Sequence, residues 1–317
     1  MYRIIIITAF MLNSFIMAGQ EKDSLLVMFW NLENFFDYID GGGGEADKEF
    51  SSSGNRRWTK NRFYTKCDAV AKTVFAIGDI CGRMPDLIGL AEVENRGVLS
   101  RMLASTALRK YDYRIIHHES GDRRGIDVAL LYRHSSMRHI SNSVRTPEYD
   151  GVKLATRDIL QVRMCLPSGC IYDFIVNHHP SKFGGAAESD KKRLAAVTTL
   201  RNMCDSLDNE KIVAMGDFND DPDSEAFEVV GDVLVNKASY LHERGEGTIR
   251  YEGKWDLIDM FLVSPKIDSI CKMEIMKIPF LMTSDRKHPG EKPLRTYTGP
   301  RYSGGVSDHC PIILRFF

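Results

Sequence analysis

The sequence lacks several features that would by themselves assign a class of protein. Its formal net charge is only −1 over 317 residues, so no overall positive charge attracts nucleic acid, although a local basic groove can still serve. No Cys-x-x-Cys pair or cysteine–histidine spacing typical of a zinc site occurs, and no internal repeat is visible. The composition is that of an ordinary globular protein, 43% hydrophobic and 27% charged.

A marked apolar stretch lies at the N-terminus. Arg3 precedes the stretch 4–17, and the small residues Ala18 and Gly19 follow it. This order is typical of a secretory signal, and the stretch is short for a transmembrane span. We therefore expect residues 1–19 to be a signal peptide, residues 20–317 to form a single domain, and the protein to be exported to the periplasm or the extracellular space. A buried strand or an uncleaved anchor is the alternative.

Export would place the cysteines in an oxidising compartment, where disulfides persist. The chain has seven cysteines, so at least one is free or pairs outside the chain. Cys165 and Cys170 flank the turn-like sequence LPSG and could face each other across a hairpin. The alternative is that all the cysteines are small buried hydrophobic residues.

Short apolar runs recur along the chain and predict strands. Several are apolar at nearly every position, which suits strands that are covered on both faces. They lie at 25–30, 86–92, 126–132, 171–177, 211–217, 257–263 and 310–316. Helical patterns alternate with them, which predicts an α/β fold.

The clearest helical pattern begins after Thr59, a plausible N-cap. One helix face carries apolar residues at alternating spacings of four and three: Phe63, Cys67, Val70, Val74 and Ile77. We expect this helix to end at Gly78, and a second helix to span about 189–207. The segments 38–57, 179–188 and 281–307 are rich in glycine or charge and are expected to be surface loops.

Polar side chains gather at the ends of the predicted strands. Those that follow a strand or end it are Asn31, Glu33, Glu92, His178, Asp217 and Asn219. Others come where a strand begins, namely Arg124, Asp259, Asp308 and His309. One rim can hold both groups only if the strands of the second group run antiparallel to those of the first. The pattern therefore predicts mixed sheets.

The residue types of this rim indicate a chemistry. Glu33, Glu92 and Asp308 are hard oxygen donors and Asn31 adds a neutral one, a set that suits Mg²⁺ or Mn²⁺. Asp259 and His309 could form a carboxylate–imidazole pair. His178, Arg124 and Asn219 can donate to a phosphoryl oxyanion. Each residue alone also has an ordinary structural explanation, such as an Asx-turn for Asp217 and Asn219.

The motifs that carry these residues resemble those of the endonuclease/exonuclease/phosphatase superfamily, which has the deoxyribonuclease I-like fold. In chain order they are WNLENFFD (30–37), LIGLAEVEN (87–95), RRGIDVALLYR (123–133), VNHHPSK (176–182), GDFND (216–220), WDLIDMFLVS (255–264) and GVSDHCPI (305–312). The resemblance implies a four-layer α/β/β/α sandwich of two mixed sheets and a metal-dependent hydrolysis of a phosphoester.

The resemblance also implies roles for the rim residues. Glu92 would be the principal Mg²⁺ ligand, and Asn31, Glu33 and Asp308 would assist it. His309 would act as general base, oriented by Asp259. Asp217 and Asn219 would align the nucleophile and the scissile phosphate, and His178 would stabilise the transition state or assist the leaving group. His179 remains an alternative to His178, Arg123 remains one to Arg124, and one or two metals remain possible.

Taken together, the sequence predicts an exported Mg²⁺-dependent phosphodiesterase, and an endonuclease acting on nucleic acid in particular. Basic groups at 56–57, 123–124 and 191–193 could contact backbone phosphates. The alternative substrate is a phospholipid head group or a sugar or inositol phosphate. A catalytically inactive binding module is disfavoured because the acidic and imidazole residues are all present. A monomer without a stable protein partner is expected.

Overall fold

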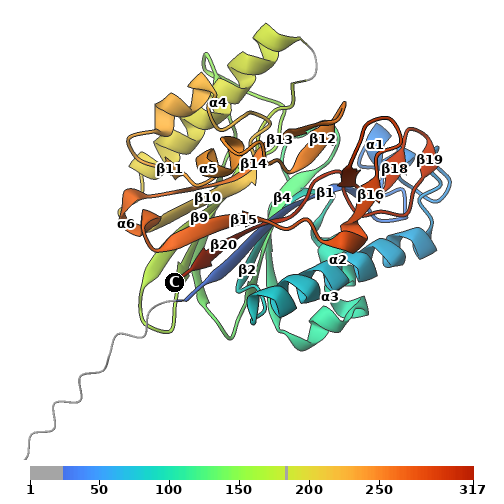
Figure 1. Ribbon diagram of the computed structural model, residues 1–317, viewed down its shortest axis with the longest axis horizontal. Coiled ribbons are helices and arrows are strands. Elements are labelled where there is room, and N and C mark those ends of the chain that lie inside the picture. Colours follow the sequence, from blue (N-terminus) through green and yellow to red (C-terminus); the bar gives the residue numbers. More distant parts are fainter. Residues whose placement is uncertain (1–23, 183–184) are drawn as a thin grey trace, which may run out of the picture.

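The computed structural model describes residues 24–182 and 185–317, so the predicted signal peptide lies outside the described residues. Two six-stranded sheets form its centre (Figure 1). The first sheet has the order β15 (Cys271–Ile275), β20 (Ile312–Phe316), β1 (Leu26–Phe35), β2 (Leu87–Val93), β4 (Asp127–Arg133) and β3 (Tyr113–His117). The second has the order β11 (Val235–Asn236), β14 (Asp259–Val263), β10 (Ile212–Asp217), β9 (Ile171–His178), β8 (Ile159–Cys165) and β5 (Arg138–Arg145).

The strand directions confirm that both sheets are mixed. In the first sheet β1 and β2 are parallel, whereas β20 runs antiparallel to β1 and β4 runs antiparallel to β2. In the second sheet β9 and β10 are parallel, and β14 runs antiparallel to β10. The strands that were expected to begin at the rim are therefore the antiparallel ones, and both sheets bring polar strand ends to one edge.

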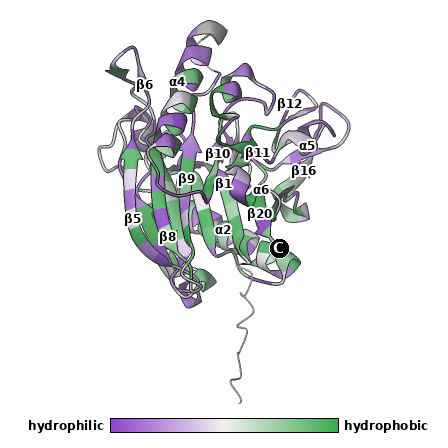
Figure 2. Cartoon of the chain, turned by 90° about the vertical axis from the view of Figure 1, so that its left-hand side faces the viewer, coloured by the Kyte–Doolittle hydropathy of each residue, from purple (hydrophilic) through white to green (hydrophobic). Residues whose placement is uncertain are grey.

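Alternate residues of β1 face two different cores. Val27 and Phe29 belong to the core between the sheets, which they share with residues of the second sheet such as Phe174 and Met215. Met28 and Trp30 belong to a second core, which lies against helices. Since both faces of the strand are covered, its run of apolar residues is continuous, and hydrophobic colour fills the middle of the sheets in Figure 2.

Helices cover the outer faces of the sheets and complete the four-layer α/β/β/α sandwich. α2 (Lys60–Cys81) and α3 (Arg96–Ser105) cover the first sheet, and α4 (Ala186–Asp205) lies on the opposite side of the molecule (Figure 1). The short helices are α1 (Glu45–Glu49), α5 (Ser239–His242), α6 (Pro265–Asp268) and the 3₁₀ turns Ala107–Lys110, Glu225–Val230 and Pro279–Leu281. No helix in the part of the chain that the structure describes is both long and apolar enough to span a membrane.

The end of α2 corrects one expectation. Thr59 caps the helix as predicted, because its side chain accepts a hydrogen bond from the backbone amide of Arg62. Gly78, however, does not end it: the helix continues to Cys81, and Gly82 closes it with a left-handed φ of 71°. Gly78 is instead buried against Met84, whose sulfur would lie 2.7 Å from a Cβ at that position. The glycine therefore serves close packing there.

Small hairpins form in the predicted loop 281–307 and in two segments outside the predicted loops. The segment 281–307 forms β16 (Met282–Ser284) with β17 (Glu291–Pro293) and β18 (Tyr297–Thr298) with β19 (Arg301–Tyr302). Before β14, β12 (Ile249–Tyr251) pairs with β13 (Lys254–Asp256), and β6 (Glu148–Tyr149) pairs with β7 (Val152–Lys153) before β8. Tyr297 and Tyr302 pack against Trp58, so the C-terminal segment is fixed to the start of α2.

All seven cysteines are free thiols. Cys165 and Cys170 flank the turn between β8 and β9 but are not bonded to each other. Cys67, Cys204, Cys271 and Cys310 are buried, which agrees with the alternative of small hydrophobic residues.

Glu94, just beyond β2, gives a testable pH dependence. Its carboxylate accepts a hydrogen bond from the Asp37 amide at 2.6 Å, and burial together with repulsion from Asp37, Asp47 and Glu119 raises its pKa from 4.5 to about 7. The folded protein therefore binds this proton more tightly than the unfolded chain, and Glu94 lowers stability as the pH rises from 4.5 to about 7. We expect Glu94→Gln to raise the unfolding temperature at pH 8 and to leave it unchanged near pH 4. An equal shift at both pH values would contradict this.

Candidate active site

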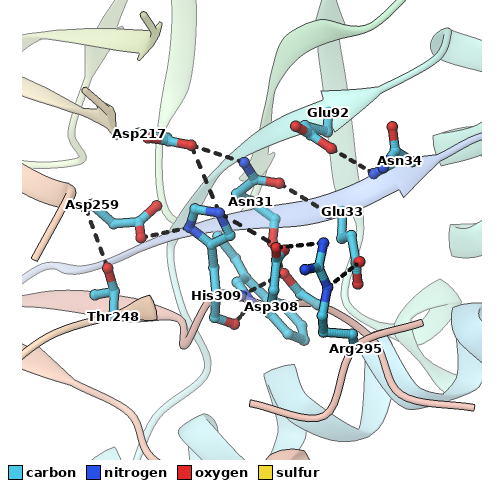
Figure 3. Close-up of polar contacts among 12 residues, drawn as sticks. Asn31, Glu33, Asn34, Glu92, Asp217, Thr248, Asp259, Arg295, Asp308 and His309 are labelled. Carbon is cyan, nitrogen blue, oxygen red and sulfur yellow. Dashed lines mark hydrogen bonds and ion pairs between the residues drawn. The ribbon is translucent and has the colours of Figure 1, made fainter. Parts of the chain in front are cut away.

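The polar strand ends converge on one edge of the two sheets (Figure 3). They come from β1 and β2 in the first sheet, from β9, β10 and β14 in the second, and from the segment before β20. Ser307 ties that last segment to β1, because its hydroxyl donates to the Asn31 carbonyl at 2.6 Å and accepts from the His309 amide at 3.0 Å. Trp30 adds a bond from its indole nitrogen to the His309 carbonyl at 2.8 Å.

The end of β1 is irregular, so the i, i+2 spacing of Asn31 and Glu33 does not place both side chains on one side of an extended strand. Glu33 and Asn34 have φ values of 48° and 52°, and the pairing with β2 is irregular between Asn31 and Phe35. Asn31 therefore donates to Asp217 at 3.0 Å, whereas the Glu33 carboxylate accepts from Arg295 at 2.9 Å and from the Thr296 amide at 2.8 Å. The two side chains do not point to one shared ligand, and as placed, both oxygens of Glu33 are occupied.

Glu92 lies next to this bulge and is itself conformationally unusual, with a φ of 59°. One carboxylate oxygen accepts from the Asn34 amide at 2.7 Å. The other lies 3.4 Å from the Arg124 guanidinium and 4.0 Å from the His178 imidazole. Glu92 thus keeps an oxygen directed toward the middle of the site.

His309 and Asp259 form the carboxylate–imidazole pair that the sequence predicted. His309 Nδ1 and Asp259 Oδ2 are hydrogen-bonded at 2.7 Å, and both side chains are buried. The other imidazole nitrogen lies 3.8 Å from Asp217 Oδ2 and 3.9 Å from Asp308 Oδ1. One nitrogen of His309 is therefore held by Asp259, and the other faces the carboxylates of the site.

The two histidines of the site have opposite electrostatic environments. Burial disfavours the charged form of His309, but the neighbouring carboxylates of Asp259 and Asp217 outweigh it and raise its pKa well above the ordinary value. Burial lowers the pKa of His178 well below the ordinary value, and Arg157 and Arg124 add to this effect. His178 is therefore neutral, whereas His309 holds its proton tightly.

Asp217 lies between these histidines. Its Oδ2 is 3.6 Å from His178 Nε2, and its Oδ1 accepts from the Asn219 amide at 2.9 Å. Burial raises the pKa of Asp217 to about 7, and the positive charge of His309 opposes that rise. This carboxyl group can therefore gain or lose a proton near neutral pH.

The structure distinguishes the residues that the sequence left as alternatives. His178 faces the site, whereas the ring of His179 packs against Phe218 with a centroid distance of 4.8 Å. The His179 carbonyl accepts from the Asn219 side chain at 3.0 Å, so Asn219 is turned partly away from the centre. Arg124 is the arginine that reaches Glu92.

Two further cations belong to the site and were not predicted. Arg295 bridges Glu33 and Asp308, with a nitrogen 2.9 Å from each carboxylate. Lys66 is buried on α2, and its ammonium donates to the Glu33 carbonyl at 2.7 Å and to Thr296 Oγ1 at 2.9 Å. Burial lowers the pKa of Lys66 to about 8 although Glu33 opposes this, and burial and Asp308 raise that of Glu33 to about 7.

The predicted metal ligands are not gathered as tightly as expected. Among the described residues at this edge, the side chains with ligand atoms within 4.8 Å of one another are Asp217, Asp259 and His309. Glu92 and Asp308 each keep a carboxylate oxygen near the centre, and the Asn31 oxygen accepts one bond, from the Glu33 amide. Hard oxygen donors of this kind fit a divalent cation that retains several waters.

Gly216 sets the distance between β9 and β10 at the site. A Cβ at this position would lie 2.3 Å from the backbone oxygen of Asn177, which cannot move without displacing β9. We expect Gly216→Ala to destabilise the fold by about 2–3 kcal/mol and to lower activity, because His178 and Asp217 end these two strands. Chemical unfolding measures the loss of stability. Gly231→Ala is the control, since its Cβ would meet only ordinary contacts from 3.6 Å, and an equal loss there would contradict the argument.

The site lies at the strand ends of a two-sheet sandwich and combines acids, imidazoles and guanidinium groups. Comparison with known protein families agrees with this arrangement. The model of the endonuclease/exonuclease/phosphatase family matches residues 26–316. The chain belongs to this family. Members of the family act on phosphoesters with a divalent metal ion, and the acidic and imidazole side chains of this site suit that chemistry. Among curated proteins, none matches it significantly.

Solved structures of the endonuclease/exonuclease/phosphatase fold resemble the chain over most of its length. A mannosyl-6-phosphatase of Bacteroides thetaiotaomicron is 16% identical, with a TM-score of 0.57 over 93% of this chain and 100% of that one. D. rerio TDP2, solved with a single strand DNA product, is 14% identical, with a TM-score of 0.55 over 93% and 99%. The human Nocturnin catalytic domain is 14% identical, with a TM-score of 0.56 over 93% and 95%. At these identities the likeness establishes the fold.

Proposed function

We propose that the protein is a Mg²⁺-dependent phosphodiesterase that hydrolyses nucleic acid. The observation that carries the proposal is the buried His309–Asp259 pair, hydrogen-bonded at 2.7 Å, whose free nitrogen faces Asp217 and Asp308. A carboxylate that fixes one imidazole nitrogen leaves the other able to exchange a proton with water or substrate.

Glu92 and Asp308 would hold the cation, with Asn31 as a neutral donor, whereas Glu33 would first have to release Arg295 and the Thr296 amide. A bound divalent cation supplies positive charge to the phosphate oxygens and offsets the carboxylates that raise the pKa of His309. Mn²⁺ is an alternative, since its ligand preferences are similar.

The surrounding residues support hydrolysis in distinct ways. His309 accepts the proton of the attacking water, and Asp259 fixes the orientation of its ring. Neutral His178 donates to the phosphoryl group from the side of Asp217, which lies 3.6 Å away. Arg124 lies beside Glu92, and its exposed guanidinium group can contact an anionic substrate. Asn219 positions the turn after β10 and the His179 carbonyl.

Two cavities beside Arg295 favour a substrate with groups on both sides of the phosphate. One of about 440 Å³ is lined by Tyr251, Lys287, Asp308 and Arg295. The other, of about 270 Å³, is lined by Arg56, Tyr297 and Arg295. Tyr251 is 68% exposed, and exposed aromatic rings beside cations are suited to stacking on bases and binding backbone phosphates. The DNA product in the D. rerio TDP2 structure is in keeping with such a substrate.

The second candidate is a small phosphomonoester such as a sugar phosphate. The larger cavity favours it, because about 440 Å³ falls in the range of small-molecule sites and adjoins Asp308. The Bacteroides mannosyl-6-phosphatase with the same fold supports this alternative. Export and a monomeric state, expected from the sequence, complete the proposal.

A substrate panel with purified protein tests the two candidates. It comprises plasmid DNA, single-stranded DNA, RNA, bis-nitrophenyl phosphate, sphingomyelin, inositol phosphates and mannose 6-phosphate, each with Mg²⁺ and with Mn²⁺. Faster turnover of nucleic acid than of the monoesters supports the proposal, and the reverse order supports the second candidate. Hydrolysis of none of them would reject both and point to a binding module.

A further inference from the structure

A second cluster of metal-ligating side chains surrounds the loop between β3 and β4. His117 ends β3, Asp127 begins β4, and Glu119 lies in the loop between them. One ligand atom from each of the three lies within 4.8 Å of the others. None of these residues takes part in the site described above.

The surroundings of His117 suit a metal ligand better than a hydrogen-bonding residue. Its side chain is 2% exposed, and its Nε2 is buried without a hydrogen-bond partner. This nitrogen lies 3.3 Å from Asp127 Oδ2, outside hydrogen-bond geometry. Two ligands that each lie about 2.1 Å from one cation are separated by about 3.0–3.4 Å in octahedral or tetrahedral geometry. The observed separation fits that arrangement.

The carboxylates of the cluster lack a permanent cation. Asp127 is 4% exposed at its side chain, and its other oxygen accepts from the Ser120 amide at 2.9 Å. Among the described residues, no lysine or arginine forms an ion pair with Asp127 or Glu119; both have only His117 as an ionic neighbour. A buried carboxylate beside an unsatisfied imidazole is costly unless a charge compensates it.

We propose that His117, Glu119 and Asp127 bind a Zn²⁺ ion that is separate from the catalytic metal. An imidazole together with carboxylates suits Zn²⁺, whereas Mg²⁺ and Ca²⁺ favour oxygen ligands alone. Three protein ligands leave a position for water. Glu119 lies beside the other imidazole nitrogen, with its carboxylate 3.7 Å from Nδ1, and its side chain is 69% exposed, so it is free to turn toward Nε2 and close onto an ion that arrives from solvent.

Such an ion would fix the loop that carries Arg124. The ligands bracket residues 118–126, and within this loop the Asp122 carboxylate accepts from the Arg124 amide at 2.9 Å and pairs with buried Arg157 at 3.2 Å. Arg124 then reaches Glu92. The ion would thus hold Arg124 in place without itself contacting substrate, and its binding does not depend on which phosphoester is hydrolysed.

The test measures Zn²⁺ binding to the full chain by calorimetry, and Co²⁺ binding by its visible absorption. We expect Glu119→Gln and His117→Gln each to weaken one binding event about tenfold or more, while Glu92→Gln leaves that event intact. Glu148→Gln, a change of another exposed glutamate, is the control and should bind as the unaltered protein does. Because Glu119 is exposed, its variant keeps the test decisive even if His117→Gln misfolds.

Two results would contradict the proposed Zn²⁺ site. If Glu119→Gln binds Zn²⁺ with unchanged affinity and stoichiometry, the proposal is wrong and His117 is only an ion-pair partner of Asp127. The same conclusion follows if Zn²⁺ binds solely at an event that Glu92→Gln removes. Neither result would depend on hydrolytic activity, so the proposed phosphodiesterase function is tested separately.

Discussion

Replacing His309 by alanine is expected to lower kcat by about 10²–10⁴-fold, the range typical of a positioned general base. The reason is its geometry: one nitrogen is fixed to Asp259 at 2.7 Å, and the other faces Asp217 and Asp308. Steady-state kinetics on the preferred substrate of the panel measures the effect. KM should change much less than kcat, because His309 acts on water and contributes little to binding.

The matched control is His134→Ala, which removes an exposed histidine that lies beyond the opposite end of β4. It should retain full activity. Asp259→Asn provides a second test, because losing this carboxylate lowers the pKa of His309. If His309 acts as the base, the acidic limb of the rate profile then moves to lower pH. Near-full activity of His309→Ala would exclude the assigned role.

Glu92→Gln is expected to lower activity by about 10²-fold or more at a fixed Mg²⁺ concentration and to weaken the apparent affinity for Mg²⁺. The substitution keeps the side-chain length, and a glutamine oxygen can still accept from the Asn34 amide, which now lies 2.7 Å from the carboxylate. The charge facing Arg124 and His178 is what disappears. A Mg²⁺ titration of the rate separates loss of metal affinity from loss of turnover.

Glu94→Gln is the matched control for Glu92→Gln. Assayed at pH 8, above the raised pKa of Glu94, it removes the same charge two residues further along the chain, where the carboxylate accepts from the Asp37 amide. Its rate and its Mg²⁺ dependence should match those of the unaltered protein. If both variants lose activity equally, the effect comes from the net charge of this region and not from ligation by Glu92.

The sequence predicted the architecture of the rim well because strand direction follows from simple geometry. Polar residues at the starts of some strands and the ends of others can meet only in mixed sheets, and β4, β14 and β20 do run antiparallel to their neighbours. His309 and Asp259 come from different sheets and meet because β14 and β20 both begin at this rim. Local sequence order was sufficient where the backbone stayed regular.

Prediction failed where the backbone left the regular geometry. The i, i+2 spacing of Asn31 and Glu33 places them on one side only in an extended strand, and a φ of 48° at Glu33 breaks that rule. Arg295 could not be found from periodicity, because it lies in a segment of short hairpins that is placed by tertiary contacts. Lys66 did leave a signal: it is a charged residue three positions after Phe63 on the apolar face of α2.

The left-handed residues at the strand ends have a consequence for engineering the protein. Glu33, Asn34, Glu92 and Asn219 all have φ values between 48° and 59°. A non-glycine residue in this conformation costs on the order of 1 kcal/mol or more, and glutamate is less tolerant of it than asparagine. Selection for thermal resistance alone should therefore favour glycine at 33 and 92. The heat-resistant variants obtained in this way would have lost a carboxylate of the site, so screening must follow hydrolysis and melting together.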